Sequence, residues 1–289
     1  MDIFGYIFSN RLARSRTGHT VLLLFLTVFA IGMFMPFVFA IMTAFKPVNE
    51  LFLFPPRFIV RHPTTKNFTD LFNLMSGSWI PMSRYVFNTL LITVAGTFGT
   101  IIIASLCAYP VSRYQFPGNS GFFRVLQSAL MYGGGVTAIP TFMIVAKTHM
   151  IDTYWAYLLP GLASPFALFI MKNFMDQMVP MEILESADMD GASEIRKFFR
   201  LVMPMSKPAW LTLTIFQVQA LWGTGSSMFI YSEQLKTLNY ALGQIASAGI
   251  ARVGVGSAIS ILLLSFPLLI FIFTQSNILE TMSTSGMKD

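Results

Sequence analysis

Long apolar stretches without a charged side chain alternate with charged segments along the chain. The charge-free stretches are 17–45, 85–112, 125–146, 153–171, 208–232 and 253–279. A helix needs roughly 20 apolar residues to cross the hydrocarbon core of a bilayer, and each stretch has about that length or more. The pattern therefore predicts an all-α, polytopic membrane protein with six transmembrane helices.

These helices define the expected domain organisation. One transmembrane domain, 19–280, lies between a cytoplasmic N-terminal segment, 1–18, and a cytoplasmic tail, 281–289. The predicted spans are about 19–44, 86–110, 122–147, 154–172, 208–232 and 254–279.

Composition and charge favour a membrane protein over a soluble enzyme. Only 11% of the residues are charged, against roughly 25% in soluble domains. All 19 Lys and Arg residues and all 13 Asp and Glu residues lie outside the six stretches. The net charge of +6 is explained by basic residues retained in cytoplasmic loops, so no binding to nucleic acid is expected. Because Arg11, Arg14 and Arg16 precede the first span, both termini are predicted to be cytoplasmic.

Several polar residues lie within the predicted spans. Gln217, Gln219 and Trp222 belong to the fifth span, and Asn88 lies near the start of the second. Amide groups and indole rings commonly hold sugars by hydrogen bonding and stacking. These four residues are therefore candidates for the lining of a substrate pathway. In the alternative interpretation, such positions and the small residues near them serve close packing between helices.

The long loop 172–207 is predicted to face the cytoplasm. Pro180 followed by Glu182 is typical of a helix start, and Gly191 is expected to end that helix. A second short helix begins near Ser193. Its apolar side is expected to consist of Ile195, Phe198, Phe199 and Val202. Two short amphipathic helices joined by a glycine form a knob that a cytoplasmic partner can bind in a groove.

The sequence of this loop resembles a known motif. Glu185-Ser186-Ala187, followed after two positions by Asp190-Gly191-Ala192, is similar to the EAA loop of ABC-importer permeases. Ser186 and Met203 stand where the family usually has Ala and Leu. The resemblance extends over most of the chain. Within the carbohydrate-uptake type, the chain is similar to the second permease subunit, which has six spans. The segment 222–228 departs from the aromatic–Asn-Asp element common in that family, which bears on substrate contacts.

The resemblance implies a binding-protein-dependent importer in the cytoplasmic membrane of a bacterium or an archaeon. The loop 180–204 would couple to a cytoplasmic ATPase. The coupling residues would be Glu185, Ser186, Ala187, Asp190, Gly191 and Ala192, with Arg196, Lys197 and Arg200 at the surface facing that subunit. The implied partners are a second permease subunit, two ATPase subunits, an extracytoplasmic solute-binding protein, membrane lipid and a saccharide. ATP and Mg²⁺ would be bound by the ATPase subunits, and no cofactor is expected in this chain. The Gly133-Gly134 pair favours larger or acidic saccharides, such as an oligouronide or alginate.

The chain lacks the residues that an enzyme or an ion-driven transporter needs. It has no Gly-x-x-x-x-Gly-Lys-Ser/Thr phosphate loop, and His19, His62 and His149 are distant from one another and from Cys107. Neither a catalytic site nor a metal site is therefore expected. The alternative function is an ion-gradient-coupled secondary transporter. It requires an acidic group within the membrane, and the six stretches contain none.

Overall fold

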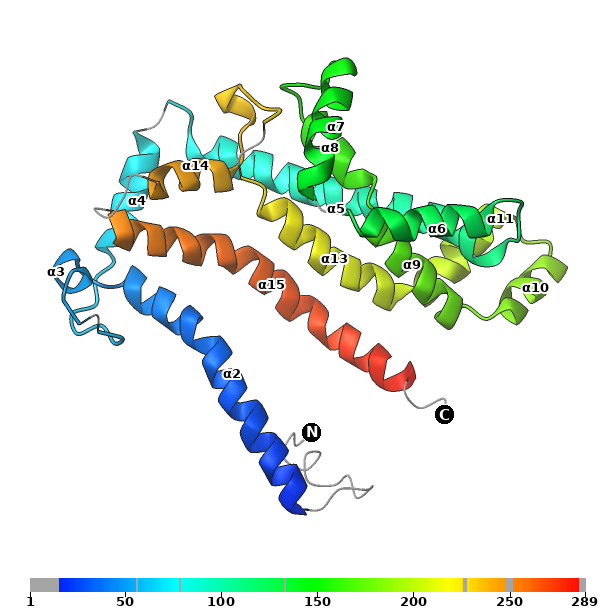
Figure 1. Ribbon diagram of the computed structural model, residues 1–289, viewed down its shortest axis with the longest axis horizontal. Helices are drawn as coiled ribbons and strands as arrows, with labels where there is room; N and C mark the ends of the chain where they lie inside the picture. Colours follow the sequence, from blue (N-terminus) through cyan, green and yellow to red (C-terminus); the bar gives the residue numbers. More distant parts are fainter. Residues whose placement is uncertain are drawn as a thin grey trace. The chain divides into compact units, whose positions relative to one another are not determined.

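The computed structural model describes residues 16–55, 57–77, 79–132, 134–225, 228–247 and 252–285. Within these residues all regular secondary structure is helical, which confirms the all-α fold class (Figure 1). Residues 1–15, with Arg11 and Arg14, lie outside the described part, as do Gly133 and 286–289.

Four helical segments are long and apolar enough to cross a membrane. They are Thr20–Ala44 of α2 (Arg16–Ala44), α5 (Met82–Arg113), Trp155–Met178 (comprising α8, Trp155–Leu162, and α9, Pro165–Met178) and Val253–Gln275 of α15 (Val253–Ser285). The helices α6 (Asn119–Leu130) and α7 (Gly134–Lys147) add a fifth candidate if this pair, bent by 110°, is one broken span. The described residues thus provide four or five candidate spans, and the prediction of six is not confirmed.

The predicted and observed spans differ where an apolar stretch contains glycines. The predicted span 122–147 is divided between α6, which ends at Leu130, and α7, which begins at Gly134 within a run of three glycines, 133–135. In the predicted span 208–232, the helix α13 (Lys207–Trp222) ends with Gly223 as its C-cap. Its 16 residues cover about 24 Å, less than the roughly 30 Å of a bilayer core. The length of a charge-free stretch therefore overestimates the length of the helix within it.

The chain divides into two compact units, Met1–Asp70 with Val253–Ile261 and Leu71–Arg252 with Leu262–Asp289. In the first unit, the loop after α2 is organised by a buried carboxylate. Glu50, in α3 (Val48–Leu51), accepts hydrogen bonds from the backbone N–H groups of Arg61 and His62, each at 3.0 Å. Asn67, in α4 (Lys66–Ser76), donates to the backbone carbonyls of Ala44 and Lys46, at 2.7 and 2.8 Å. This loop is therefore folded by specific polar contacts.

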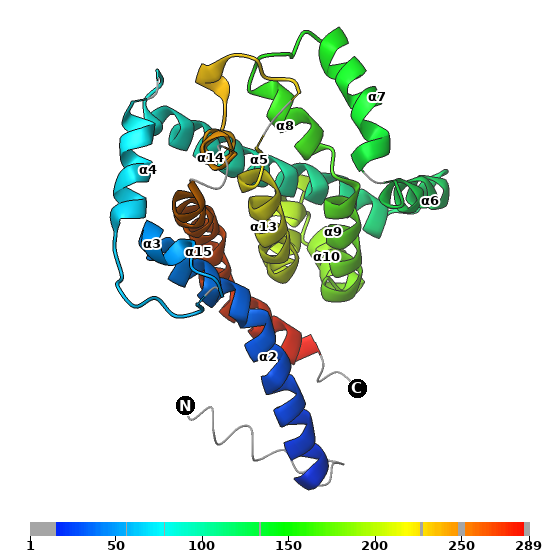
Figure 2. The same ribbon diagram turned by 60° about the vertical axis from the view of Figure 1, so that its left-hand side comes forward.

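The central helix of the second unit is α5. It packs against α8, α9, α13 and α14 (Leu238–Ala246), and Figures 1 and 2 show it running past them. Gly96 permits the close approach of α13, because a Cβ atom there would lie 2.6 Å from Cδ1 of Leu221. Small residues thus serve helix packing on α5, as they do in many membrane proteins.

The two ends of α5 carry different structures (Figure 1). At the end of α5 lie α10 (Met181–Met189), α11 (Glu194–Lys197), a π-helix (Phe198–Val202) and α12 (Met203–Met205). We call residues 180–204 the knob. Its buried side chains join one apolar cluster with α5, α9 and α13. The short 3₁₀ helix η2 (Glu233–Leu235) and α14 lie at the start of α5.

Candidate functional site

The first helix of the knob ends in a complete Schellman motif. The N–H of Ala192 donates to the carbonyl of Ala187, and the N–H of Gly191 donates to that of Asp188, each at 2.9 Å. These are the two hydrogen bonds that define the motif, whose central residue is left-handed. Gly191 has φ 70°, a conformation that costs residues with a side chain about 1–2 kcal/mol. The structure thus explains why a glycine ends α10, as the sequence pattern predicts.

One face of α10 packs against the rest of the unit, and the other is open. Leu184 is buried in the apolar cluster, and Ala187 is also buried. Glu185 and Ser186 are exposed, and Met189 is 90% exposed. Asp190, Gly191 and Ala192 follow at the turn, where Asp190 and Gly191 are exposed and Ala192 is partly buried. The predicted coupling residues therefore lie on α10 and the turn that follows it, and all of them except Ala187 are at least partly exposed.

The position of Lys197 differs from the prediction. It was expected at the surface with Arg196 and Arg200, but only 3% of its side chain is exposed. Its ammonium group forms ion pairs with Asp188, at 2.6 Å, and with Glu194. Tyr109 of α5 donates a hydrogen bond to Glu194 Oε2 at 2.8 Å. Lys197 therefore joins α10 to α11, and Glu194 joins α11 to α5.

These contacts shift the ionisation of both partners. Hydrogen bonds to Asp188 and then Glu194 raise the pKa of Lys197, and the hydrogen bond from Lys197 is the main cause of a lowered pKa at Glu194. Both groups are consequently held in their charged forms, which keeps the ion pairs intact near neutral pH.

Two of the four residues expected on the apolar side of the second knob helix are exposed, so this prediction is wrong for them. Phe198 and Val202 are buried, whereas Ile195 is 73% exposed and Phe199 55% exposed. For Phe199 the physical reason is the π-helix over 198–202, because its wider turn changes which side chains share a face; Ile195 lies before it, in α11. The exposed pair adds apolar surface to the knob.

The four predicted pathway residues do not share one environment. Asn88 is fully buried; its Nδ2 donates to the carbonyls of Gln234 and Lys236 at 2.8 and 2.9 Å. Trp222 is also buried, its indole N–H donating to the carbonyl of Leu263 at 2.8 Å. Both side chains thus make structural contacts. Gln217 is buried and Gln219 is exposed. Contact of these four residues with substrate stays a prediction.

A cavity of about 510 Å³ lies between α5, α13 and α15. None of the four predicted pathway residues lines it. Its lining is Thr93, Val94, Thr97, Phe98, Ile101, Ile102, Phe199, Met203, Trp210, Thr214, Val218, Phe266 and Ile270. The hydroxyl groups of Thr93 and Thr97 are buried one helical turn apart and have no hydrogen-bond partner among the described residues. Sequence reasoning missed this cavity because its lining comes from helices far apart in the chain.

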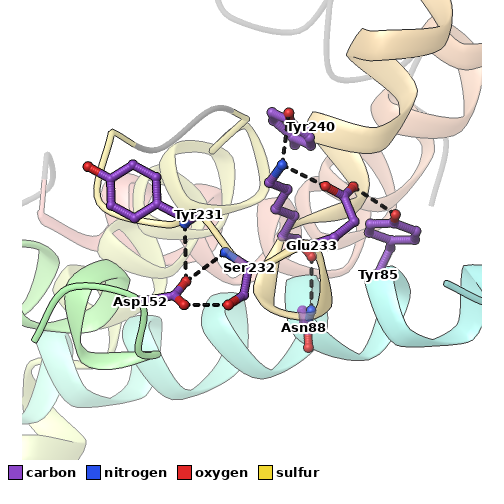
Figure 3. Close-up of polar contacts among 8 residues, drawn as sticks. Tyr85, Asn88, Asp152, Tyr231, Ser232, Glu233 and Tyr240 are labelled. Carbon is purple, nitrogen blue, oxygen red and sulfur yellow. Dashed lines mark hydrogen bonds and ion pairs between the residues drawn. The ribbon is translucent and has the colours of Figure 1, made fainter. Parts of the chain in front are cut away.

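A group of hydrogen bonds holds the loop 228–237 against α5 (Figure 3). We call its members the polar clasp: Tyr85, Asn88, Asp152, Tyr231, Ser232, Glu233, Lys236 and Tyr240. Asp152 accepts hydrogen bonds from the backbone N–H groups of Tyr231 and Ser232, at 3.1 and 2.8 Å, and from the Ser232 hydroxyl. The hydrogen bond from that hydroxyl is the main cause of a lowered pKa at Asp152. The carboxylate is therefore charged and fixes the start of the loop.

The other end of the loop is held by a second carboxylate. Tyr85 donates to Glu233 Oε1 at 2.9 Å, and the ammonium group of Lys236 lies 2.6 Å from Glu233 Oε2. Lys236 also donates to the hydroxyl of Tyr240 at 3.0 Å. The polar clasp thus preorganises a loop whose first residues were expected to belong to a span. The sequence offers one signal for this contact. Asp152 lies just before a predicted span, and aspartate side chains in turns commonly accept hydrogen bonds from backbone N–H groups.

Comparisons with known proteins identify the family. No protein-family model matches the chain. The chain is 33% identical over 211 residues to the polygalacturonan/rhamnogalacturonan transport system permease protein YtcP of Bacillus subtilis (strain 168), covering 72% of this chain and 70% of that protein. It is 28% identical over 224 residues to the arabinooligosaccharides transport system permease protein AraQ of the same organism, covering 77% and 78%.

A solved structure has the same fold. One chain of a bacterial ABC transporter involved in the import of the acidic polysaccharide alginate matches with a TM-score of 0.77 and 18% identity, covering 91% of this chain and 98% of that one. The relatives are transporter permease subunits rather than enzymes. With the long apolar helices, they indicate an integral protein of the inner membrane that works with other subunits. The chain belongs to the carbohydrate-uptake permeases of ABC transporters.

Proposed function

We propose that the chain is a permease subunit of an ATP-driven, binding-protein-dependent importer whose substrates are acidic oligosaccharides such as oligouronides. YtcP is named for the transport of polygalacturonan and rhamnogalacturonan, and the solved structure of the same fold belongs to an alginate importer. Polygalacturonan and alginate are both chains of uronic acids. This shared chemistry supports an acidic substrate for the present chain.

The observation that carries the proposed coupling is the geometry of the knob. A short helix with an exposed carboxylate at Glu185, ended by a turn at Gly191, suits docking into a groove of an ATPase subunit. Exposed apolar side chains at Met189 and Ile195 add surface that such a groove can bury. The ATPase subunits bind ATP and Mg²⁺ in this proposal, and this chain holds neither.

The proposed topology has six spans and both termini in the cytoplasm. The pair α6 and α7 forms one broken span, and the stretch 208–232, which contains most of α13, forms the fifth. The 32 residues of α5 cover about 48 Å, more than the bilayer core. The knob and the polar clasp lie at opposite ends of this helix, and they accordingly lie on opposite sides of the membrane. A second permease subunit completes the pathway, and a solute-binding protein delivers the saccharide on the clasp side.

The knob transmits force through defined contacts. Movement of α10 is passed to α11 by the ion pairs of Lys197, and to α5 by the hydrogen bond between Tyr109 and Glu194. Closure of the ATPase subunits therefore displaces α5 together with the knob. Because α5 packs against α8, α9 and α13, its displacement changes the packing of the membrane domain.

Replacement of Gly191 tests the proposed coupling. The substitution Gly191→Pro removes the N–H that donates to Asp188 and forces φ from 70° toward about −65°. We expect the variant to lose at least tenfold in co-purified ATPase subunit and in saccharide-stimulated ATP hydrolysis. The measurement is co-purification of the complex from membranes, followed by hydrolysis assays in proteoliposomes.

Gly118→Pro is the matched control. Gly118 also has a positive φ, 97°, and a Cβ atom there would likewise meet no other atom within 4 Å, but this glycine precedes α6 rather than ending α10. This control should retain the ATPase subunit. Retention of the subunit by Gly191→Pro as well would contradict the coupling role of the knob. Uphill saccharide accumulation by the chain alone, without nucleotide, would contradict the whole proposal.

A further inference from the structure

A second, smaller pocket lies at the start of α5. It has a volume of about 340 Å³ and is lined by Trp79, Ile80, Pro81, Arg84 and Gln234. Pockets that hold small ligands have volumes of roughly 300 Å³ or more, with a few convergent polar groups among apolar ones. This pocket combines an indole ring, a guanidinium group and an amide within that volume.

The indole ring of Trp79 is open to a ligand, because 98% of the residue is exposed. A flat aromatic face is the surface on which the apolar face of a pyranose ring packs. Aromatic residues also gather at membrane interfaces, where they serve as anchors. The neighbouring cationic and amide groups distinguish this pocket from a simple anchor.

Arg84 is held in place by its own contacts and retains donors for a ligand. Its Nε donates to the carbonyl of Gln234 at 3.2 Å, and one Nη2–H donates to the hydroxyl of Tyr154 at 3.4 Å. A guanidinium group has five N–H donors, so Nη1 and part of Nη2 stay available. Arg84 forms no ion pair with any residue that the structure describes. Its charge is therefore free to pair with an incoming carboxylate.

The Gln234 side of the pocket is fixed by the polar clasp. Asn88 donates to the carbonyl of Gln234 at 2.8 Å. The neighbouring Glu233 accepts from Tyr85 at 2.9 Å (Figure 3). The backbone of Gln234 is thereby immobilised while its side chain is exposed. A wall that is ordered before the ligand arrives lowers the entropic cost of binding.

We propose that this pocket binds one uronic-acid unit of the saccharide as it enters from the clasp side. The ring of Trp79 packs on the sugar, Arg84 pairs with the carboxylate, and the amide of Gln234 bonds a hydroxyl group. The proposal rests on the proposed saccharide substrate and adds a site at which acidic saccharides are distinguished from neutral ones.

Binding measurements on the assembled complex test this site. The permeases and ATPase subunits, without the solute-binding protein, are placed in nanodiscs of uncharged phosphatidylcholine and titrated with tetragalacturonate or with its methyl ester. Arg84→Gln should weaken tetragalacturonate binding at least tenfold and leave the weaker binding of the ester unchanged. Trp79→Ala should weaken both ligands, and Trp79→Phe should restore most of the affinity.

Arg61→Gln and Trp155→Ala are the matched controls, since they remove an exposed arginine and an exposed tryptophan elsewhere in the chain. Both should leave the dissociation constants unchanged. The site is overturned if wild type binds neither ligand, if Arg84→Gln changes nothing, or if it weakens acid and ester equally. Transport by the complete importer is measured in parallel. If the importer takes up saccharides although the pocket variants bind them as wild type does, this site alone is rejected. If the importer takes up no saccharide, the proposed function is rejected as well.

Discussion

At the scale of single residues, Lys197 shows how a charged side chain becomes part of the interior. Lysine is rarely buried without a partner, and the resemblance to the EAA loop implies a position at the surface. Its partner Asp188 lies nine residues away across the turn at Gly191, a separation that no helical spacing relates. The buried position follows only once the Schellman motif has folded α10 back toward α11. The burial of Lys197 thus depends on the left-handed conformation of Gly191.

Replacement of Lys197 by Met should loosen the knob. The carboxylates of Asp188 and Glu194 are more than half exposed, so water compensates part of the lost interaction, and we expect a cost of about 1–2 kcal/mol. Saccharide-stimulated ATP hydrolysis should fall several-fold, with basal hydrolysis by the ATPase subunits unchanged. Thermal unfolding and hydrolysis assays of the complex measure both effects.

Lys172→Met provides the comparison for that variant. Lys172 also forms an ion pair of 2.6 Å, with Asp176, but within a single helix. Its loss should cost roughly 0.5 kcal/mol or less. Equal effects of the two substitutions on stimulated hydrolysis would show that Lys197 has no special part in coupling.

At the scale of elements, sequence patterns predict what depends on local spacing. The apolar runs of α2, α5 and α15 are long and free of charge, and the turn at Gly191 has a local signature. The π-helix over 198–202 has no such local signature in the sequence. The polar clasp joins Tyr85 to Glu233, 148 positions apart, and one sequence alone contains no trace of that pairing. The predicted substrate pathway had the same weakness, since the sequence around Asn88 is equally compatible with a ligand-binding and a structural role.

Asp152 offers a test of the polar clasp as an element. Asp152→Asn keeps a residue type that tolerates the positive φ of 61° but removes the charge that holds two backbone N–H groups. A hydrogen bond to a charged group stabilises by about 1 kcal/mol more than a neutral one, so the amides of Tyr231 and Ser232 should exchange with deuterium about fivefold to tenfold faster. Hydrogen-exchange mass spectrometry of the complex in nanodiscs measures this change.

Glu50→Gln is the control for that experiment. Glu50 likewise accepts from two backbone N–H groups, those of Arg61 and His62, in the first unit. Its replacement should accelerate exchange at 61 and 62 and leave the loop 228–237 unaffected. Unchanged exchange at Tyr231 in Asp152→Asn would mean that other contacts suffice to hold the loop.

At the scale of the whole molecule, α5 connects the two proposed functions. Energy enters at the knob and the saccharide enters near the polar clasp, and the same helix carries Tyr109 at one end and Arg84 at the other. The knob can meet the ATPase subunits and the polar clasp can receive the saccharide only if the two face opposite sides of the membrane. The orientation of α5 is therefore the feature on which both proposals depend.

Cysteine labelling determines that orientation. Cys107 is the only cysteine of the sequence, so Cys107→Ser gives a background into which Tyr231→Cys or Met189→Cys can be introduced. Tyr231 is 66% exposed and Met189 90% exposed, at opposite ends of α5 in the same unit. In intact cells whose outer membrane is permeable, a charged maleimide should label Tyr231→Cys, whereas Met189→Cys should react only after the inner membrane is opened. Labelling of Met189→Cys in intact cells would place the knob outside, where no ATPase could reach it, and both the coupling and the entry site would have to be abandoned together.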